Sequence, residues 1–350
     1  MAILKGFLLA LSLGASLPSA LGYQLHPRDT SSNDPYPFCN PATNANCIVG
    51  GKYLVPQLDF SLENDVGDQA FRQYLPTHTF TLSQWTNGKM PERCYFWAVT
   101  ADHWNPADFV IYNVTYSDCS IPFVMCYNVK AGKTASQVAT EISRLPVKMR
   151  QSTSMYLVYG DAASDNPSYT GFMAALCGDG IIIGRSSGYF TTSLIHETGH
   201  VVDSHPLPGS TEFSSTSTWH NAVIQDGYAV TAYGAGSYVE DFADTGRAVL
   251  LDAIYPGGLA GFAPNNPNLT QITHQLAAFK AVAGQYYVTG GSCDTGHKFP
   301  FPTSLVTVVA PTTTTSASLG TATPYGQCGG WSTYTGPTLC GAGYSCTTLK

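Results

Sequence analysis

The sequence predicts an α+β domain, in which strands come first along the chain and most helices follow. Short β-branched or aromatic runs, bounded by Gly, Asp or Pro, predict strands over residues 109–115, 122–127, 155–159 and 181–184. Apolar residues at helical spacing predict helices over residues 194–204, 238–254 and 271–282. An earlier helix, over residues 136–145, is predicted to begin at a Ser cap and to end before Pro146.

Composition divides the 350 residues into five segments. Lys5 and the apolar run behind it predict a secretory signal peptide over residues 1–22, and polar residues 23–46 predict an irregular leader or a short pro-segment. Residues 47–300 are long enough for one sizeable core, which a cleft could divide. Residues 301–323 are rich in Thr, Ser and Pro and predict a stiff linker, and a small module follows over residues 324–350.

Charge and cysteine content narrow the functional classes. The net charge of -7 argues against nucleic acid as a partner, because phosphate binding needs a basic face. No later apolar run is long enough to span a membrane, so we expect no membrane association. Ten cysteines predict disulfides and a secreted, extracellular protein. Asn113 and Asn268 begin Asn-X-Thr motifs and are candidate glycosylation sites.

The centre of the chain carries a candidate metal site, HETGH over residues 196–200. His196 and His200 are four residues apart, so a helix would project both from one face, where they could bind one Zn²⁺. Glu197 could act as the base that takes a proton from a water molecule activated by the ion. The alternative is a surface helix that carries two histidines by chance, but Leu194, Ile195, Val201 and Val202 give this helix an apolar face.

A third ligand must come from another segment. The metzincin continuation fails here, because Pro206 stands where the third His would be. Glu240 on the predicted helix 238–254 is the preferred third ligand, although Ser237 and Glu240 could instead form a capping box. Asp244 lies one turn after Glu240, so it could hold the second nitrogen of a ligand histidine, or simply be a solvated carboxylate.

HETGH followed by EDFAD at residues 240–244 resembles the gluzincin pattern of zinc peptidases. Together with YAVTAY at residues 228–233, these segments are similar to the peptidase domain of anthrax lethal factor. The region from about residue 71 to 283 also resembles secreted fungal conidiation-specific proteins, which are treated as metallopeptidases. These resemblances imply a zincin-like fold, zinc bound by His196, His200 and Glu240, Glu197 as base, and Tyr233 as an oxyanion donor, with Tyr228 as its rival.

The C-terminal segment closely resembles a fungal family 1 cellulose-binding module. YGQCGGW at residues 325–331 and YTGP at residues 334–337 carry the likeness, which implies a small disulfide-rich β module that binds cellulose through Tyr325, Trp331 and Tyr334. The family pattern would pair Cys328 with Cys346. With three of the four expected cysteines, the module looks incomplete.

The sequence therefore predicts a secreted zinc endopeptidase that acts on protein or peptide substrates and is held on cellulose or a related wall polysaccharide. A second reading is a metal-binding or cell-surface protein with little activity. A third reading is a glycoside hydrolase, whose carboxylate pair would come from Glu63, Glu92, Glu141 or Glu212.

Overall fold

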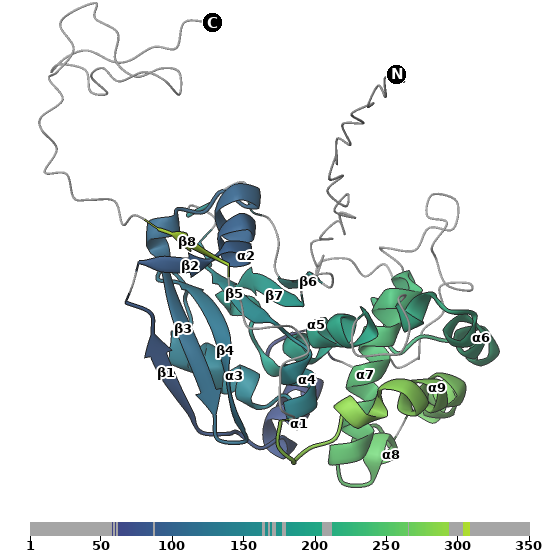
Figure 1. Cartoon of the computed structure of the whole chain (residues 1–350). Coiled ribbons are helices and arrows are strands. Elements are labelled where there is room, and N and C mark those ends of the chain that lie inside the picture. Colours follow the sequence, from purple (N-terminus) through teal and green to yellow (C-terminus); the bar gives the residue numbers. More distant parts are fainter. Residues whose placement is uncertain are drawn as a thin grey trace, which may run out of the picture.

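The computed structural model shows a mixed α and β domain (Figure 1). It describes residues 58, 60, 62–86, 88–162, 165, 166, 169, 173–176, 180–204, 212–264, 266–293 and 304–308. The predicted signal peptide, leader and C-terminal module lie outside these residues. Within them, no helix is both long and apolar enough to cross a membrane.

A six-stranded mixed sheet forms one half of the domain. Its strands are, in chain order, β1 (Phe80–Gln84), β3 (Phe109–Tyr116), β4 (Cys119–Asn128), β5 (Met155–Tyr159), β6 (Met173–Leu176) and β7 (Ile181–Arg185). In space they follow the order β1-β3-β4-β5-β7-β6. Strands β4, β5 and β7 are parallel, and the pairs β1–β3, β3–β4 and β6–β7 are antiparallel.

The central strands are apolar on both faces because both faces are covered. All five residues of β5 are buried, and successive side chains point to opposite sides of the sheet. Tyr156 and Val158 join the larger of two hydrophobic clusters, whereas Met155, Leu157 and Tyr159 join the smaller one. The sheet itself therefore separates the two parts of the core.

A small cap covers the face of the sheet with the smaller cluster. It contains β2 (Lys89–Pro91), α2 (Glu92–Tyr95), the π-helix η2 (Phe96–Ala101) and β8 (Leu305–Thr307). Strand β8 pairs antiparallel with β2, and a disulfide joins Cys94 of α2 to Cys126 of β4. The predicted boundary at residue 300 is therefore too early, because residues 305–307 of the expected linker still belong to the folded domain.

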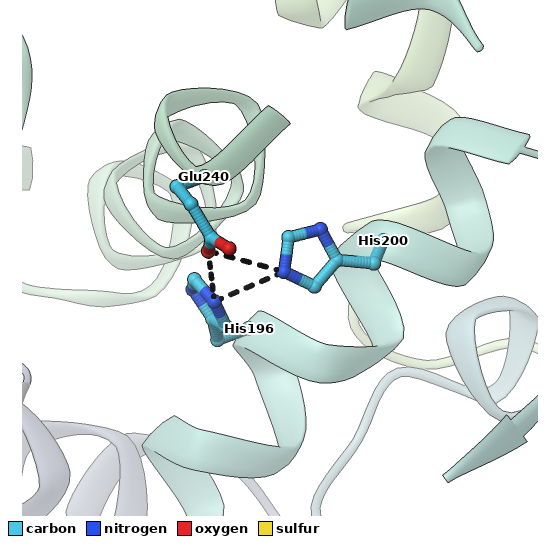
Figure 2. A group of neighbouring side chains, drawn as sticks. All are labelled: His196, His200 and Glu240. Carbon is cyan, nitrogen blue, oxygen red and sulfur yellow. Dashed lines mark hydrogen bonds and ion pairs between the residues drawn. The ribbon is translucent and has the colours of Figure 1, made fainter. Parts of the chain in front are cut away.

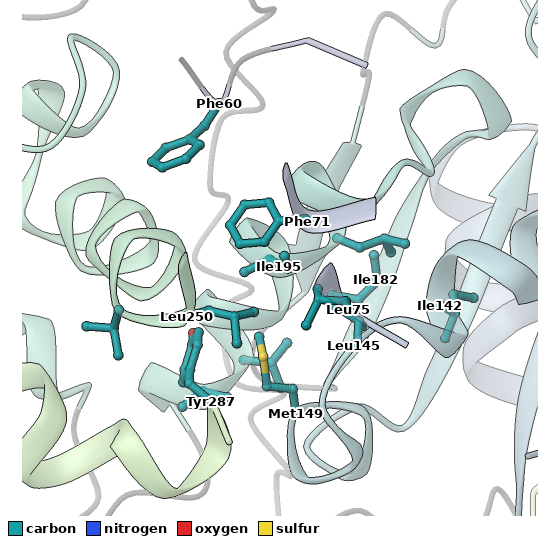
Figure 3. Close-up of a cluster of buried hydrophobic side chains, with 14 of the residues drawn as sticks. Phe60, Phe71, Leu75, Ile142, Leu145, Met149, Ile182, Ile195, Leu250 and Tyr287 are labelled. Atoms are coloured by element: carbon teal, nitrogen blue, oxygen red, sulfur yellow. The ribbon is translucent and has the colours of Figure 1, made fainter. Parts of the chain in front are cut away.

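Helices cover the other face. They are α1 (Val66–Tyr74), α3 (Ala135–Ser143), α4 (Val147–Gln151), α5 (Thr191–Ser204), α6 (Ser217–Asp226), α7 (Tyr238–Ile254), α8 (Gly258–Phe262) and α9 (Thr273–Ala283). Figure 1 shows α5 between the sheet and the group formed by α6, α7 and α9. The larger cluster fills this junction, where Ile182 of β7, Ile195 of α5 and Leu250 of α7 are fully buried (Figure 3).

The predicted starts of α3 and α9 differ from those in the structure. Helix α3 begins after Thr134, not at Ser136: the Thr134 hydroxyl accepts from the Gln137 amide, and the Gln137 side chain accepts from the Thr134 amide. Helix α9 begins at Thr273 because residues 267–272 form a 3₁₀ turn. Helix α7 has the predicted bounds.

A disulfide connects the segment that follows α9 to the sheet. After α9, a 3₁₀ turn (Gly284–Tyr286) leads to Tyr287, whose side chain is buried in the larger cluster. Cys293 then forms a disulfide with Cys119 at the start of β4. This bridge closes a loop that contains α5, α7 and the candidate ligands.

Candidate metal centre

Helix α5 carries the HETGH motif and begins three residues before the predicted start. The Thr192 amide donates to Asp68 Oδ1 at 3.0 Å, and the Thr191 hydroxyl donates to Glu141 Oε2 at 2.7 Å. Both acceptors belong to distant parts of the chain. Asp68 satisfies a backbone amide in the first turn of α5 in the way that a local cap would, whereas Glu141 holds the Thr191 side chain. Local sequence patterns reveal neither acceptor.

Helices α5 and α7 cross at very short range. A Cβ atom built on Gly199 would lie 3.2 Å from Ala243 Cα and 3.4 Å from Ala243 Cβ. Glycine at this position of the motif therefore allows the two backbones to approach each other. The approach brings Glu240, near the start of α7, to the two histidines of α5.

Three potential ligand atoms converge at this crossing (Figure 2). His196 Nε2 lies 3.0 Å from Glu240 Oε2 and 3.1 Å from His200 Nε2. His200 Nε2 lies 3.3 Å from the same Glu240 oxygen. Ligand atoms of a tetrahedral zinc site with bonds of about 2.0–2.2 Å lie roughly 3.3 Å apart, so the spacing suits such an ion.

Asp244 determines which nitrogen of His196 carries a proton. Its Oδ1 lies 2.7 Å from His196 Nδ1, and an ionised carboxylate only accepts, so Nδ1 must donate. The remaining Nε2 then points its lone pair at Glu240 and His200. Electron pairs gathered in this way repel one another unless a cation or a proton lies between them. The donor set therefore fits a divalent metal ion.

Without a metal ion, the site holds a proton instead. Burial by itself would lower the pKa of His200, but the adjacent Glu240 carboxylate outweighs burial and raises the pKa to about 9. Burial likewise opposes ionisation of Glu240, yet the two histidines hold the pKa of its carboxyl well below the usual range. A metal ion would replace this proton.

Asp244 belongs to a buried network, of which the sequence indicates only one part. It is fully buried, accepts from the Thr231 hydroxyl, and pairs with the Arg247 guanidinium. Burial would raise the pKa of Asp244, but Arg247 and His196 together lower it well below the usual range. Arg247 follows Asp244 by three residues on α7, and this spacing was the available signal for the missed partner.

The candidate base and oxyanion donor both lie close to the ligands. Glu197 follows His196 on α5 and is only half-buried, whereas its neighbours His196 and Thr198 are buried. The ring of Tyr233 lies 5.5 Å from that of His196, centroid to centroid, at a tilt of 57°. Its rival Tyr228 packs against the larger cluster, and its carbonyl accepts from Gln275.

Of the capping box that Ser237 and Glu240 could form, the structure contains the hydrogen bond to the Ser237 hydroxyl. The Ser237 hydroxyl accepts from the Glu240 amide at 3.2 Å, so Ser237 is the N-cap of α7. The Glu240 carboxylate lies with the two histidines. The two roles are compatible because one uses the backbone of Glu240 and the other its side chain.

Three of the four glutamates that could serve a glycoside hydrolase have other partners. Glu63 and Glu141 both pair with Arg72, at 2.9 and 3.2 Å. Glu212 accepts from the Ser204 hydroxyl, and Glu92 is exposed at the start of α2. Ion pairs with Arg72 of α1, together with the hydrogen bond from Thr191 of α5 to Glu141, account for the first two residues without a catalytic role.

The remaining predicted sites lie away from the metal ligands or outside the described residues. Asn113 is half-buried on β3, and its side-chain carbonyl accepts from Trp85 Nε1 at 2.8 Å. Asn268 is half-buried in the 3₁₀ turn before α9. The structure does not describe the predicted cellulose-binding residues and disulfide, which are Tyr325, Trp331, Tyr334, Cys328 and Cys346.

Comparisons with known proteins place both parts of the chain. The model of the fungal cellulose binding domain matches residues 324–350, which supports binding of cellulose or a related polysaccharide. Conidiation-specific protein 13 of Neurospora crassa is 29% identical over 191 residues, which make up 53% of this chain and 53% of that protein. The similarity thus spans about half the length of this relative.

No solved structure matches the chain. The model of the conidiation-specific protein Con-13 family matches residues 60–260, more than half of the chain, and the chain belongs to that family.

Proposed function

We propose that this chain is a secreted zinc endopeptidase with a zincin-like catalytic domain, held on cellulose or a related polysaccharide by its C-terminal module. The observation that carries the proposal is the convergence of His196, His200 and Glu240, with the proton of His196 directed to Asp244. A bound zinc ion supplies Lewis acidity, which polarises a carbonyl and lowers the pKa of water.

The residues of the chain supply the remaining chemistry. Glu197, half-buried beside His196, takes a proton from the attacking water and passes it to the leaving nitrogen. Tyr233 donates a hydrogen bond to the carbonyl oxygen as negative charge develops there. Asp244 and Arg247 keep the His196 ring in one orientation and one tautomer.

The test compares the wild-type protein with Glu197→Gln on an unfolded protein substrate, with and without a zinc chelator. Glu92→Gln is the matched control, because Glu92 is exposed at the start of α2. We expect Glu197→Gln to lower the cleavage rate about 10²- to 10⁴-fold, the usual contribution of a general base, while the protein retains its zinc. The control should cleave like the wild type.

A second candidate function is a metal-binding surface protein with little activity. The same convergence of ligand atoms supports it, because the zinc site does not depend on Glu197. Stoichiometric zinc in a wild-type protein that cleaves nothing would favour this function. Release of reducing sugar from cellulose would instead favour a glycoside hydrolase. Retention of the full chain on cellulose, compared with Trp331→Ala, tests the anchoring role.

A further inference from the structure

The two histidines of the candidate centre are supported unequally. His196 donates from Nδ1 to Asp244 at 2.7 Å. His200 Nδ1 is buried and has no hydrogen-bond partner among the described residues. If His200 Nε2 is to present a lone pair to a metal ion, the proton of its neutral ring must lie on Nδ1 and needs an acceptor.

A buried carboxylate with a spare oxygen lies one turn further along the same helix. Asp203 is 1% exposed, and its Oδ1 accepts from the Ser214 amide at 2.8 Å. Its Oδ2 is buried without a hydrogen-bond partner among the described residues. Burial raises the pKa of Asp203 to about 6, and the charge of His200 is among the effects that oppose this rise. The two side chains therefore lie within electrostatic range of each other.

A third unpaired polar atom points into the same region. Tyr287 is 1% exposed, and its hydroxyl has no hydrogen-bond partner among the described residues. This oxygen lies in a notch between the ligand helices, where Cβ atoms built on Gly199 and Gly246 would approach it to 3.2 and 2.6 Å (Figure 3 shows the ring). Burial is the main reason why the pKa of Tyr287 is raised, and Asp203 is the next.

The three atoms complement one another chemically. His200 Nδ1 and the Tyr287 hydroxyl are donors, and Asp203 Oδ2 is an acceptor that can take two hydrogen bonds. Buried polar groups are almost always paired in folded proteins, either directly or through a buried water. Asp203 Oδ2 could take both donors, either directly or through a bridging water.

We propose that Asp203 is the positioning residue of His200, with Tyr287 as its second donor, so that each metal-binding histidine is held by its own buried carboxylate. The inference rests on the proposed metal centre. It assigns Asp203 no contact with substrate, and its action is to fix the tautomer and the ring plane of His200. Its consequence is therefore expected in metal affinity before it is expected in catalysis.

The experiment measures zinc dissociation constants of the full chain by competition with a chromophoric chelator, for the wild type, Asp203→Asn and Tyr287→Phe. We expect Asp203→Asn to weaken zinc binding about 10- to 100-fold, the usual effect of removing such a partner. Tyr287→Phe should weaken it less. The absorption spectrum of the cobalt-substituted protein should shift in Asp203→Asn, because the ring of His200 turns.

The matched controls are Asp226→Asn and Tyr156→Phe. Asp226, the last residue of α6, is also a buried carboxylate, and it accepts from two backbone amides at the start of α9. Tyr156 is also buried, and its hydroxyl is hydrogen-bonded to Thr153. These variants should lose stability without loss of zinc affinity. Equal zinc affinity in the wild type, Asp203→Asn and Tyr287→Phe would overturn this inference alone. A wild type that binds no zinc would overturn the proposed function as well. If Asp203→Asn does not fold, Tyr287→Phe decides the question.

Discussion

The central strands and the crossing of α5 with α7 both bury apolar side chains, but the crossing also buries ionisable ones. Strands β4, β5 and β7 bury aliphatic, aromatic and sulfur-containing residues, among them Val124, Leu157 and Ile183. Helices α5 and α7 bury Asp203, Asp244 and Arg247 as well as the two histidines. Apolar burial stabilises a fold directly, whereas buried ions cost several kcal/mol each in lost hydration. Charges retained at such a cost suggest a use beyond stability, and we assign that use to ligand orientation.

The largest effect is expected where a charge of the crossing loses its partner. Asp244→Asn leaves Arg247 buried without its counter-ion and lets the His196 ring turn. We expect a loss of about 3–5 kcal/mol in the free energy of unfolding and weaker zinc binding by about 10- to 100-fold. Denaturant unfolding and zinc competition measure the two effects. Wild-type zinc affinity in Asp244→Asn would show that the buried charge does not orient the metal ligands.

The sheet offers the contrasting substitution. Leu157 is fully buried on β5, so Leu157→Ala should cost about 2–5 kcal/mol through lost burial and a cavity. Because Leu157 faces the smaller cluster, on the side of the sheet away from α5 and α7, the protein that remains folded should bind zinc with unchanged affinity. Calorimetry and zinc competition on the same samples provide the measurement. Weaker zinc binding at full folding would mean that the two regions are coupled.

The close crossing itself can be tested by adding one methyl group. Gly246→Ala would place Cβ 2.6 Å from the Tyr287 hydroxyl, and we expect a loss of about 1–3 kcal/mol from overpacking. In the background of Tyr287→Leu, which lacks the ring, the same change should stabilise α7 by up to about 1 kcal/mol through helix propensity. A double-mutant cycle of thermal unfolding checks this reversal. If Gly246→Ala changes the stability with the same sign in both backgrounds, the close approach of Gly246 to the Tyr287 hydroxyl is contradicted.

The smallest effect concerns pH in the zinc-free protein. The pKa of His200, raised to about 9 from an ordinary 6.5, means that the protonated ring stabilises the fold. This contribution is complete below pH 6.5 and is lost as the pH rises through 9. In chelator-treated samples, the melting temperature of the wild type relative to His200→Gln should therefore fall between pH 6.5 and 9. Zinc affinity should rise over the same interval, because the ion displaces this proton. A melting-temperature difference independent of pH would argue against the ion pair of His200 and Glu240.

Long periodic segments were predictable from the sequence, and short or distantly capped ones were not. Strand β5 and helix α7 have the predicted bounds. Helix α5 begins earlier because Asp68, from another part of the chain, accepts from the backbone amide of Thr192 in its first turn. Helices α1 and α6 and the pair β2–β8 were not predicted. The strands of that pair are only three residues long, so their existence depends on each other and not on local pattern.

The sequence by itself determined the helical spacing of His196 and His200 and the turn that separates Glu240 from Asp244. Helix periodicity is a local property, so residues three or four positions apart can be placed without the rest of the molecule. Only the tertiary structure decided that His196 Nε2 lies 3.0 Å from Glu240 Oε2 and that Nδ1 of His196 is the donor. It also decided that Arg247 faces Asp244, that Cys119 pairs with Cys293, and that Asp203 is buried. These relations depend on how closely two helices pack, and that distance follows from the side chains of both helices together.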